Sequence, residues 1–227
     1  MHILQQTASD AHRTTRGLAG LQRNAQLLAR LVGDLLDTSR IHVGKLRVQL
    51  QPVMLAPVVR RALEDAAIAA VERDVTLDQA IEPVGTVLAD EHRIEQVVTN
   101  LVSNALKFTP AQGRVSVKLF ERDGYARLVV ADTGEGIAAD FLAHVFEPFT
   151  QGQSENSSQG LGLGLANVKH LVDAHCGRIS AESAGAGRGT TFVVELPLAD
   201  APPALDGVDV GASQTRMVEP ADRTVVH

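Results

Sequence analysis

Cysteine and aromatic residues are scarce in this sequence of 227 residues, and both shortages exclude classes of function. Cys176 is the single cysteine, which excludes an internal disulfide framework and a cysteine-built zinc site. Aromatic residues make up 3% of the chain, with no Trp and one Tyr, which argues against a stacking platform for single-stranded nucleic acid. The formal net charge of −6 argues against a nucleic-acid partner as well.

Long apolar runs are missing too. No run approaches the roughly 18 residues that a helix needs to span a bilayer. The opening MHILQQTASD lacks the basic region and the long apolar stretch of a signal peptide. We therefore expect no membrane segment in this chain and a cytoplasmic location.

The apolar residues that are present, 44% of the chain, suffice for one sizeable core and a smaller element. The first predicted element is one long helix over residues 18–42, where apolar residues recur at spacings of three and four. Such a stripe needs partner helices, from this chain or from a second copy. The alternative is a helix packed on its own domain. The pattern does not decide between pairing with partner helices and packing on that domain.

From residue 46 the pattern changes to alternating runs and shorter amphipathic stretches. The predicted elements are a strand from about 46, a helix at 55–74, strands at 75–81 and 86–90, a helix at 91–107, a hairpin turning at Asp123-Gly124, a helix at 163–176 ended by Gly177, and a closing hairpin. This order indicates an α+β sandwich with helices on one face of a mixed sheet. Residues 199–227 show no sustained periodicity, and we expect a linker or a disordered tail there.

Three polar residues share one face of the predicted 91–107 helix: Asn100, Asn104 and Lys107. Amide oxygens are suitable ligands for Mg²⁺, and a lysine ammonium is a point charge for phosphate. A solvated helix face is the alternative interpretation of the same three residues.

The sequence Asp132-Thr-Gly134-Glu-Gly136 follows a predicted strand directly. A carboxylate at a strand end can accept a hydrogen bond from an exocyclic amine. Glycines beside it allow the backbone to approach a flat ligand closely. An ordinary tight turn is the alternative.

Gly160, Gly162 and Gly164 come immediately before a predicted helix, where glycine-rich backbone can cradle phosphate. The segment is neither a P-loop nor a dinucleotide fingerprint, and a flexible hinge is the alternative. Upstream of it, Phe146 and Phe149 either anchor the base of a mobile lid or form a small satellite core.

Taken in their order along the chain, the four clusters resemble the N box, G1 box, F box and G2 box of histidine kinase catalytic domains. Those domains belong to a wider family that includes the gyrase, Hsp90 and MutL ATPases. The resemblance covers residues 46–198, and LARLVGDLLDTSRIHVGKLRV upstream resembles the second dimerisation helix of such kinases. It implies a two-layer α/β sandwich, the Bergerat ATP-binding fold, preceded by a long dimerisation helix within a partial dimerisation region at 1–45.

The resemblance also implies a role for each matching polar residue. Asn104 would bind Mg²⁺, Asn100 would lie beside the metal and the phosphates, and Lys107 would reach a phosphate. Asp132 would recognise the adenine amine, and Thr190 would lie near the adenine. ATP and Mg²⁺ are therefore the expected substrate and cofactor.

The matching glycines would shape the pocket. Gly134 and Gly136 would line the base, whereas Gly160, Gly162 and Gly164 would flank the triphosphate. Residues 137–160 would form a lid over the nucleotide.

The residue type at position 100, here Asn100, differs between branches of the family. Hydrolytic relatives carry a glutamate at this position as general base for water, a role that an amide cannot perform. The resemblance is therefore to the histidine kinase branch, and a stand-alone ATPase is disfavoured.

A phosphoacceptor motif is missing from this sequence, because none of its eight histidines is followed by an acidic residue. The chain resembles a kinase core that begins just after the acceptor, and its tail resembles the linker before a receiver domain. We expect it to phosphorylate a histidine supplied by another domain or chain, to pair as a homodimer or heterodimer through helix 18–42, and to serve a response regulator receiver domain. The isolated chain is expected not to autophosphorylate. The alternative is an ATP-binding and dimerisation module that transfers no phosphate.

Overall fold

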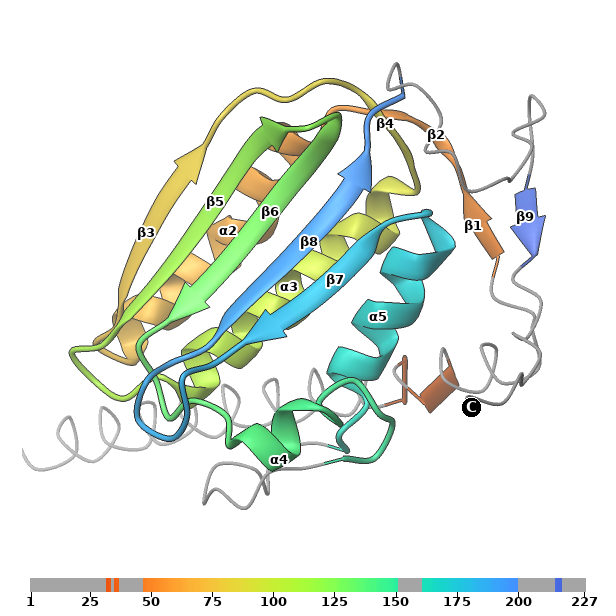
Figure 1. Ribbon diagram of the computed structural model, residues 1–227. Helices are drawn as coiled ribbons and strands as arrows, with labels where there is room; N and C mark the ends of the chain where they lie inside the picture. The colour runs from red at the N-terminus through yellow and green to blue at the C-terminus, as the bar shows by residue number, and fades with distance from the viewer. Residues whose placement is uncertain (1–31, 34, 37–46, 151–160, 200–214, 218–227) are drawn as a thin grey trace, which may run out of the picture.

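The computed structural model describes residues 32–33, 35–36, 47–150, 161–199 and 215–217 (Figure 1). Its helices are α2 (Leu55–Glu72), α3 (Glu91–Phe108), α4 (Ala139–Leu142) and α5 (Gly164–Ala174). Its strands are β1 (Arg47–Gln49), β2 (Gln51–Val53), β3 (Thr76–Ile81), β4 (Val87–Ala89), β5 (Arg114–Arg122), β6 (Tyr125–Asp132), β7 (Arg178–Glu182), β8 (Thr191–Pro197) and β9 (Thr215–Met217).

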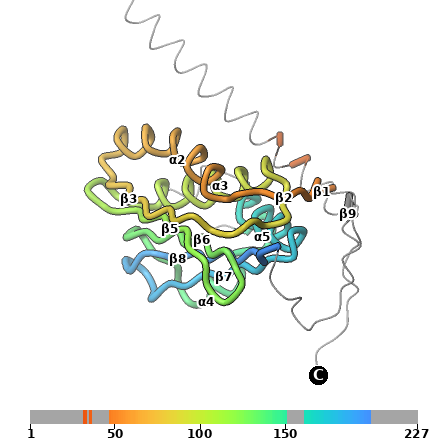
Figure 2. Tube along the Cα trace, turned by 90° about the horizontal axis from the view of Figure 1, so that it is seen from above, coloured from red at the N-terminus to blue at the C-terminus, as the bar shows by residue number. Residues whose placement is uncertain are grey.

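A five-stranded mixed sheet with the order β3-β5-β6-β8-β7 forms one layer. The β3–β5 pair is parallel, and the other three pairs are antiparallel. Helices α2, α3 and α5 lie together behind the sheet in Figure 1 and form the second layer in the view from above (Figure 2). The predicted α+β sandwich with helices on one face of a mixed sheet is confirmed.

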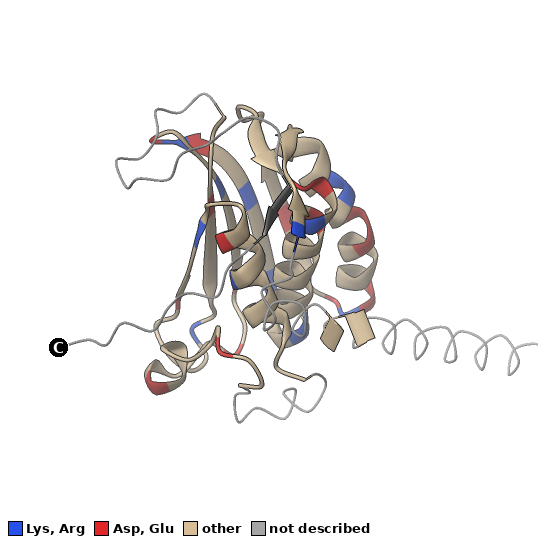
Figure 3. Ribbon diagram, turned by 90° about the vertical axis from the view of Figure 1, so that its right-hand side faces the viewer, with Lys and Arg blue, Asp and Glu red and all other residues tan. Residues whose placement is uncertain are grey.

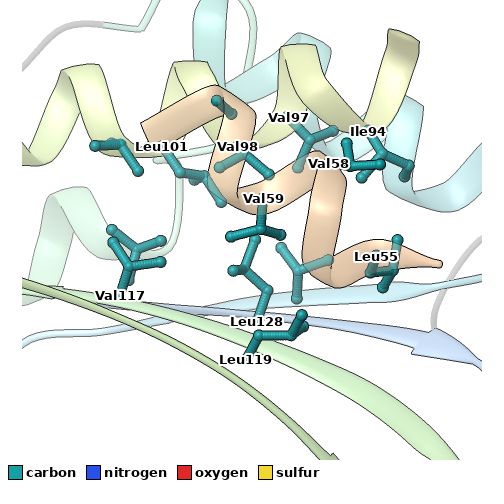
Figure 4. Packing of buried hydrophobic residues seen from close by; sticks show 14 of the residues in the cluster. Leu55, Val58, Val59, Ile94, Val97, Val98, Leu101, Val117, Leu119 and Leu128 are labelled. Atoms are coloured by element: carbon teal, nitrogen blue, oxygen red, sulfur yellow. The ribbon is translucent and has the colours of Figure 1, made fainter. Parts of the chain in front are cut away.

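The core lies between these two layers (Figure 4). Alternate residues of β5 and β6, such as Val117, Leu119 and Leu128, point toward the helices, as the period of a half-buried strand requires. Val98 and Leu101 of α3 meet them, and both are fully buried. Lys, Arg, Asp and Glu are interspersed over the outer surfaces of the helices and strands (Figure 3). The apolar face of α3 thus fixes the helix on the sheet and leaves its polar face available.

The single strand predicted from residue 46 is instead two short strands. β2 pairs with β4, whereas β1 pairs with β9, which lies in the tail. β9, Thr215–Met217, is thus a short strand within the stretch predicted as a linker or disordered tail. Backbone pairing with a distant strand leaves no periodicity in so short a segment, which is why the sequence did not indicate it.

The predicted helix at 18–42 lies mostly outside the described residues. Residues 32–33 and 35–36 are helical, as predicted. Val32, Leu35 and Leu36 are exposed there, with 55%, 52% and 51% of their surface accessible. The apolar stripe is thus open at the three positions that can be described.

The end of α5 differs in detail from the prediction. The helix ends at Ala174, and Cys176, not Gly177, adopts the left-handed conformation, with φ at 57°. The Gly177 and Cys176 N–H groups donate to the carbonyls of Val172 and Asp173, which is the Schellman pattern. Gly177 is needed for another reason, because a Cβ there would lie 2.6 Å from the Glu195 carbonyl oxygen.

Candidate functional site

The polar face of α3 carries Asn100, Asn104 and Lys107, all half-buried. Asp90 caps the helix by accepting a hydrogen bond from the Arg93 N–H at 3.2 Å. The Asn100 Nδ2 atom is buried and has no hydrogen-bond partner among the residues that the structure describes. A buried amide without a partner is costly, so this atom suits a site that a polar ligand completes.

Lys107 lies at the last turn of α3, with its Nζ 4.8 Å from the centre of the Phe108 ring. Partial burial lowers the pKa of Lys107, the positive charge of Arg73 lowers it further, and Glu135 acts in the opposite direction. Lys107 is the basic residue in the last turn of α3, and its ammonium is a point charge that an anion can approach.

Asp132 is the last residue of β6, in the middle of the sheet. Its Oδ1 accepts hydrogen bonds from the Gly134 N–H at 2.8 Å and the Thr190 N–H at 3.2 Å. Burial raises the pKa of this carboxyl, and the two backbone donors oppose the shift. Within the described part of the chain Oδ2 receives no hydrogen bond, so it is the atom left to accept from a ligand.

Gly134 and Gly136 are required by close backbone approaches. A Cβ at Gly134 would lie 2.3 Å from the Phe108 carbonyl oxygen, and one at Gly136 would lie 2.1 Å from that of Gly185. The Glu135 N–H also donates to the Phe108 carbonyl at 3.1 Å. The loop after β6 is thereby held against the end of α3, which brings the predicted base-binding and phosphate-binding residues together.

The loop between β7 and β8 also contributes to the site, which the sequence did not indicate. The Ser183 hydroxyl accepts a hydrogen bond from the Ile137 N–H at 2.9 Å and donates to the Gly189 carbonyl at 2.7 Å. A Cβ at Gly189, where φ is +69°, would lie 2.0 Å from the Asp132 carbonyl oxygen. The glycine-rich run SAGAGRGT was the available signal. Thr190, next to it, is buried and bonds Asp132 in both directions.

The predicted phosphate glycines are placed only in part, because Gly160 lies outside the described residues. Gly162 has φ at +68°, and its carbonyl accepts a hydrogen bond from the Phe149 N–H at 3.0 Å. Gly164 is the first residue of α5, and a Cβ there would meet nothing within 4 Å. Among the described residues no side-chain capping hydrogen bond is made at this helix start, so its first N–H groups can receive an anion.

The two phenylalanines take different environments. Phe146 packs edge-on against Phe192 of β8, with ring centres 6.3 Å apart, and so joins the core. Phe149 has φ at +62° and is 63% exposed. Of the predicted lid, residues 137–150 are described and include α4, and residues 151–160 lie outside the described part.

Among the described residues, no helix has the length and apolar character that crossing a membrane requires. The same residues contain no cluster of three or more His, Cys, Asp or Glu side chains that could hold a metal ion. Asn104 offers an amide oxygen, which is a different kind of oxygen donor from those side chains.

Comparison with known proteins identifies the family to which this fold belongs. Residues 89–200 match the family described as histidine kinase-, DNA gyrase B- and HSP90-like ATPase. The mycobacterial sensor histidine kinase MprB is 34% identical in a solved structure, with a TM-score of 0.59, over 65% of this chain and 97% of that one. A structure of full-length ShkA in complex with AMPPNP is 36% identical, with a TM-score of 0.67, over 77% of this chain and 36% of that one.

Two curated relatives are longer proteins. Sensor protein DivL of Caulobacter vibrioides is 34% identical over 89% of this chain, which spans 26% of DivL. The signal transduction histidine-protein kinase BaeS of Escherichia coli is 35% identical over 82% of this chain, which spans 40% of BaeS. The chain therefore belongs to the histidine kinase-like ATPase family, and it carries the ATP-binding catalytic domain of histidine kinases.

Proposed function

We propose that the site built by α3, the end of β6 and the start of α5 binds Mg-ATP and transfers its γ-phosphoryl group to a histidine. The observation that carries the proposal is the environment of Asp132. Its Oδ1 is fixed by two backbone N–H groups, its Oδ2 is open, and Gly134 and Gly189 beside it leave no room for side chains. These features suit an adenine whose amine donates to the carboxylate, with Gly136 and Thr190 lining the base.

The α3 residues suit the metal and the phosphates. Asn104 would hold Mg²⁺ through its amide oxygen, and the buried Asn100 Nδ2 without a partner would donate to a phosphate oxygen. Lys107 would add a positive charge, and the glycines at Gly160, Gly162 and Gly164 would allow the backbone at the start of α5 to approach the phosphates. A bound Mg²⁺ would neutralise charge on the phosphate oxygens.

The histidine acceptor must be brought to this site by another domain or chain. Positioning and electrostatic stabilisation supply most of the catalysis of phosphoryl transfer, so an in-line imidazole is needed. Asn100 has no basic lone pair with which to activate water, which disfavours simple hydrolysis. We therefore infer that this chain alone does not autophosphorylate.

Dimerisation and partner choice follow the same proposal. Val32, Leu35 and Leu36 are exposed on a helical segment, which suits pairing of helix 18–42 with a second copy or a related chain. A response regulator receiver domain would take the phosphoryl group from the histidine. The proposed setting is cytoplasmic, with no nucleic-acid partner.

The test is incubation of the 227-residue chain with γ-labelled ATP and Mg²⁺, with and without a separately purified acceptor-helix domain. We expect acid-labile label on the acceptor domain and none in its absence. Release of inorganic phosphate without the domain would instead support an ATPase. ATP binding without transfer to any acceptor would support the alternative of a binding and dimerisation module.

A further inference from the structure

His175 is a buried histidine outside the proposed ATP site, and 3% of its surface is exposed. It follows α5 directly and occupies the C-cap position of that helix. The imidazole Nδ1 lies 2.6 Å from the Leu171 carbonyl oxygen, and Nε2 lies 3.0 Å from the Asp90 backbone nitrogen. The ring therefore bridges the end of α5 and the start of α3.

These two contacts define one protonation state. A carbonyl oxygen can only accept, so Nδ1 carries a proton and donates to Leu171. A backbone N–H can only donate, so Nε2 carries a lone pair and accepts from Asp90. A second proton on the ring would place N–H against N–H and would remove the bridge to α3.

The bridge meets α3 at a residue with other roles. The Asp90 side chain caps α3 through Oδ1 and accepts from the Gln49 N–H at 3.1 Å through Oδ2. Its backbone N–H is the group that His175 accepts from. His175 thus fixes a junction at which β1, α3 and the end of α5 meet.

The far ends of the same two helices carry proposed nucleotide residues. Gly164 begins α5, one helix length of about 16 Å from His175 for 11 residues. Asn104 and Lys107 lie in the second half of α3. The end of α5 meets the start of α3 at His175. Gly164, Asn104 and Lys107 therefore lie toward the other ends of the two helices, away from this junction (Figure 1).

We propose that His175 is a positioning residue of the ATP site: its neutral imidazole holds α5 against α3, and protonation releases that contact and weakens nucleotide binding. The proposal rests on the proposed function, and it adds an acid-sensitive control of that site. A small rotation of α5 about its released end displaces its start relative to Asn104, and phosphate binding depends on that separation.

The direction of the pH effect follows from the surroundings. Burial lowers the pKa of His175 below its ordinary 6.5; the Leu171 contact and the charge of Asp90 raise it, and Arg93 lowers it. Asp90 and Arg93 are the charged groups from α3 that act on the ring, and α5 itself carries the exposed Lys169–Asp173 ion pair. The native contact is therefore complete above the ordinary value and is lost as the pH falls below it.

The test compares three forms of the full chain: wild type, His175→Gln and His92→Gln. A glutamine oxygen at 175 can accept from the Asp90 N–H and does not titrate. His92 is an exposed histidine on α3, so its replacement is the matched control. Calorimetry with an ATP analogue at about pH 7.5 and about pH 5.5 measures how the affinity of each form depends on pH. The phosphates of the ligand also titrate, but their effect is the same for all three forms and cancels in the comparison.

We expect wild type and His92→Gln to lose at least roughly threefold more affinity on acidification than His175→Gln does. An identical pH dependence in wild type and His175→Gln would overturn the proposal. An NMR titration of the wild-type chain with pH, which follows the His175 ring and the Gly164 amide, provides a second measurement that does not depend on the variants. We expect neutral His175 with its proton on Nδ1, and a Gly164 amide signal that shifts with the same midpoint as the imidazole.

We call the contact through which His175 holds α5 against α3 the clamp. Failure of the clamp and failure of the proposed function give different results. If no form of the chain binds nucleotide at about pH 7.5, the proposed function fails, and the NMR titration still decides the clamp. A His175 that is charged at neutral pH, or a Gly164 signal that does not follow it, contradicts the clamp alone.

Discussion

Asp132 is held by the backbone on one oxygen and left open on the other. Replacing the open oxygen by an amide turns an acceptor into a donor, so Asp132→Asn is expected to weaken ATP binding by about 1–3 kcal/mol. Calorimetry measures the change, and Asp123→Asn is the matched control, since that carboxylate is exposed and lies in the β5–β6 turn, at the opposite end of β6 from Asp132. Equal affinities of Asp132→Asn and the control would remove Asp132 from the adenine site.

Asn104 can be tested separately from the nucleotide base. We expect Asn104→Ala to remove the Mg²⁺ dependence of ATP binding, because the amide oxygen is the proposed ligand, while the fold persists. Titrations with and without Mg²⁺ measure this, and thermal unfolding of the same samples checks the fold. Ser103→Ala is the control on the same helix, since the Ser103 hydroxyl donates only to the Asn100 carbonyl. Wild-type Mg²⁺ dependence in Asn104→Ala would place the metal ligand elsewhere.

At the scale of elements, α5 ends in a Schellman motif whose left-handed position is occupied by Cys176, with φ at 57°. A residue with a Cβ is strained in this conformation, and glycine is not. We expect Cys176→Gly to raise the free energy of unfolding by about 0.5–1 kcal/mol, the relief being partly offset by the greater entropy of an unfolded glycine. Urea unfolding measures it, with Cys176→Ala as the control that keeps the Cβ. Equal stabilities of the two variants would show that the cap is not strained.

Elements with local signals were predictable from the sequence, and long-range contacts were not. The β5–β6 hairpin turns at Asp123-Gly124 as predicted, because two adjacent residues with positive φ decide the turn. Asp132 and Gly134 are two residues apart, and their hydrogen bond follows from one short segment. By contrast, Ser183 and Ile137 are 46 residues apart, and Thr190 and Asp132 are 58 apart. Only the folded sheet brings them together, so the sequence could suggest Thr190 by resemblance alone and did not suggest Ser183.

At the scale of the whole molecule, the proposed phosphoryl transfer depends on whether any histidine of this chain can reach the nucleotide. A histidine acceptor needs a neutral, accessible imidazole that can reach the γ-phosphate in line. His175 is buried with both ring nitrogens engaged, and it lies at the end of α5 opposite to Gly164. His144 is exposed, but its Nδ1 lies 2.8 Å from Glu147, and this hydrogen bond raises the pKa of the imidazole, so more of it is protonated near neutral pH.

We therefore expect the purified chain to bind ATP without acquiring acid-labile label from γ-labelled ATP. Label retained after alkaline treatment and lost after acid treatment measures phosphohistidine, and Asp132→Asn, which is expected to bind ATP poorly, gives the background. Addition of an acceptor-helix domain to the same sample is the positive control, since it provides the missing imidazole without changing this chain. Stoichiometric label on any of the eight histidines in the chain alone would contradict the prediction. Peptide mapping of that label would then identify an acceptor that needs no following acidic residue.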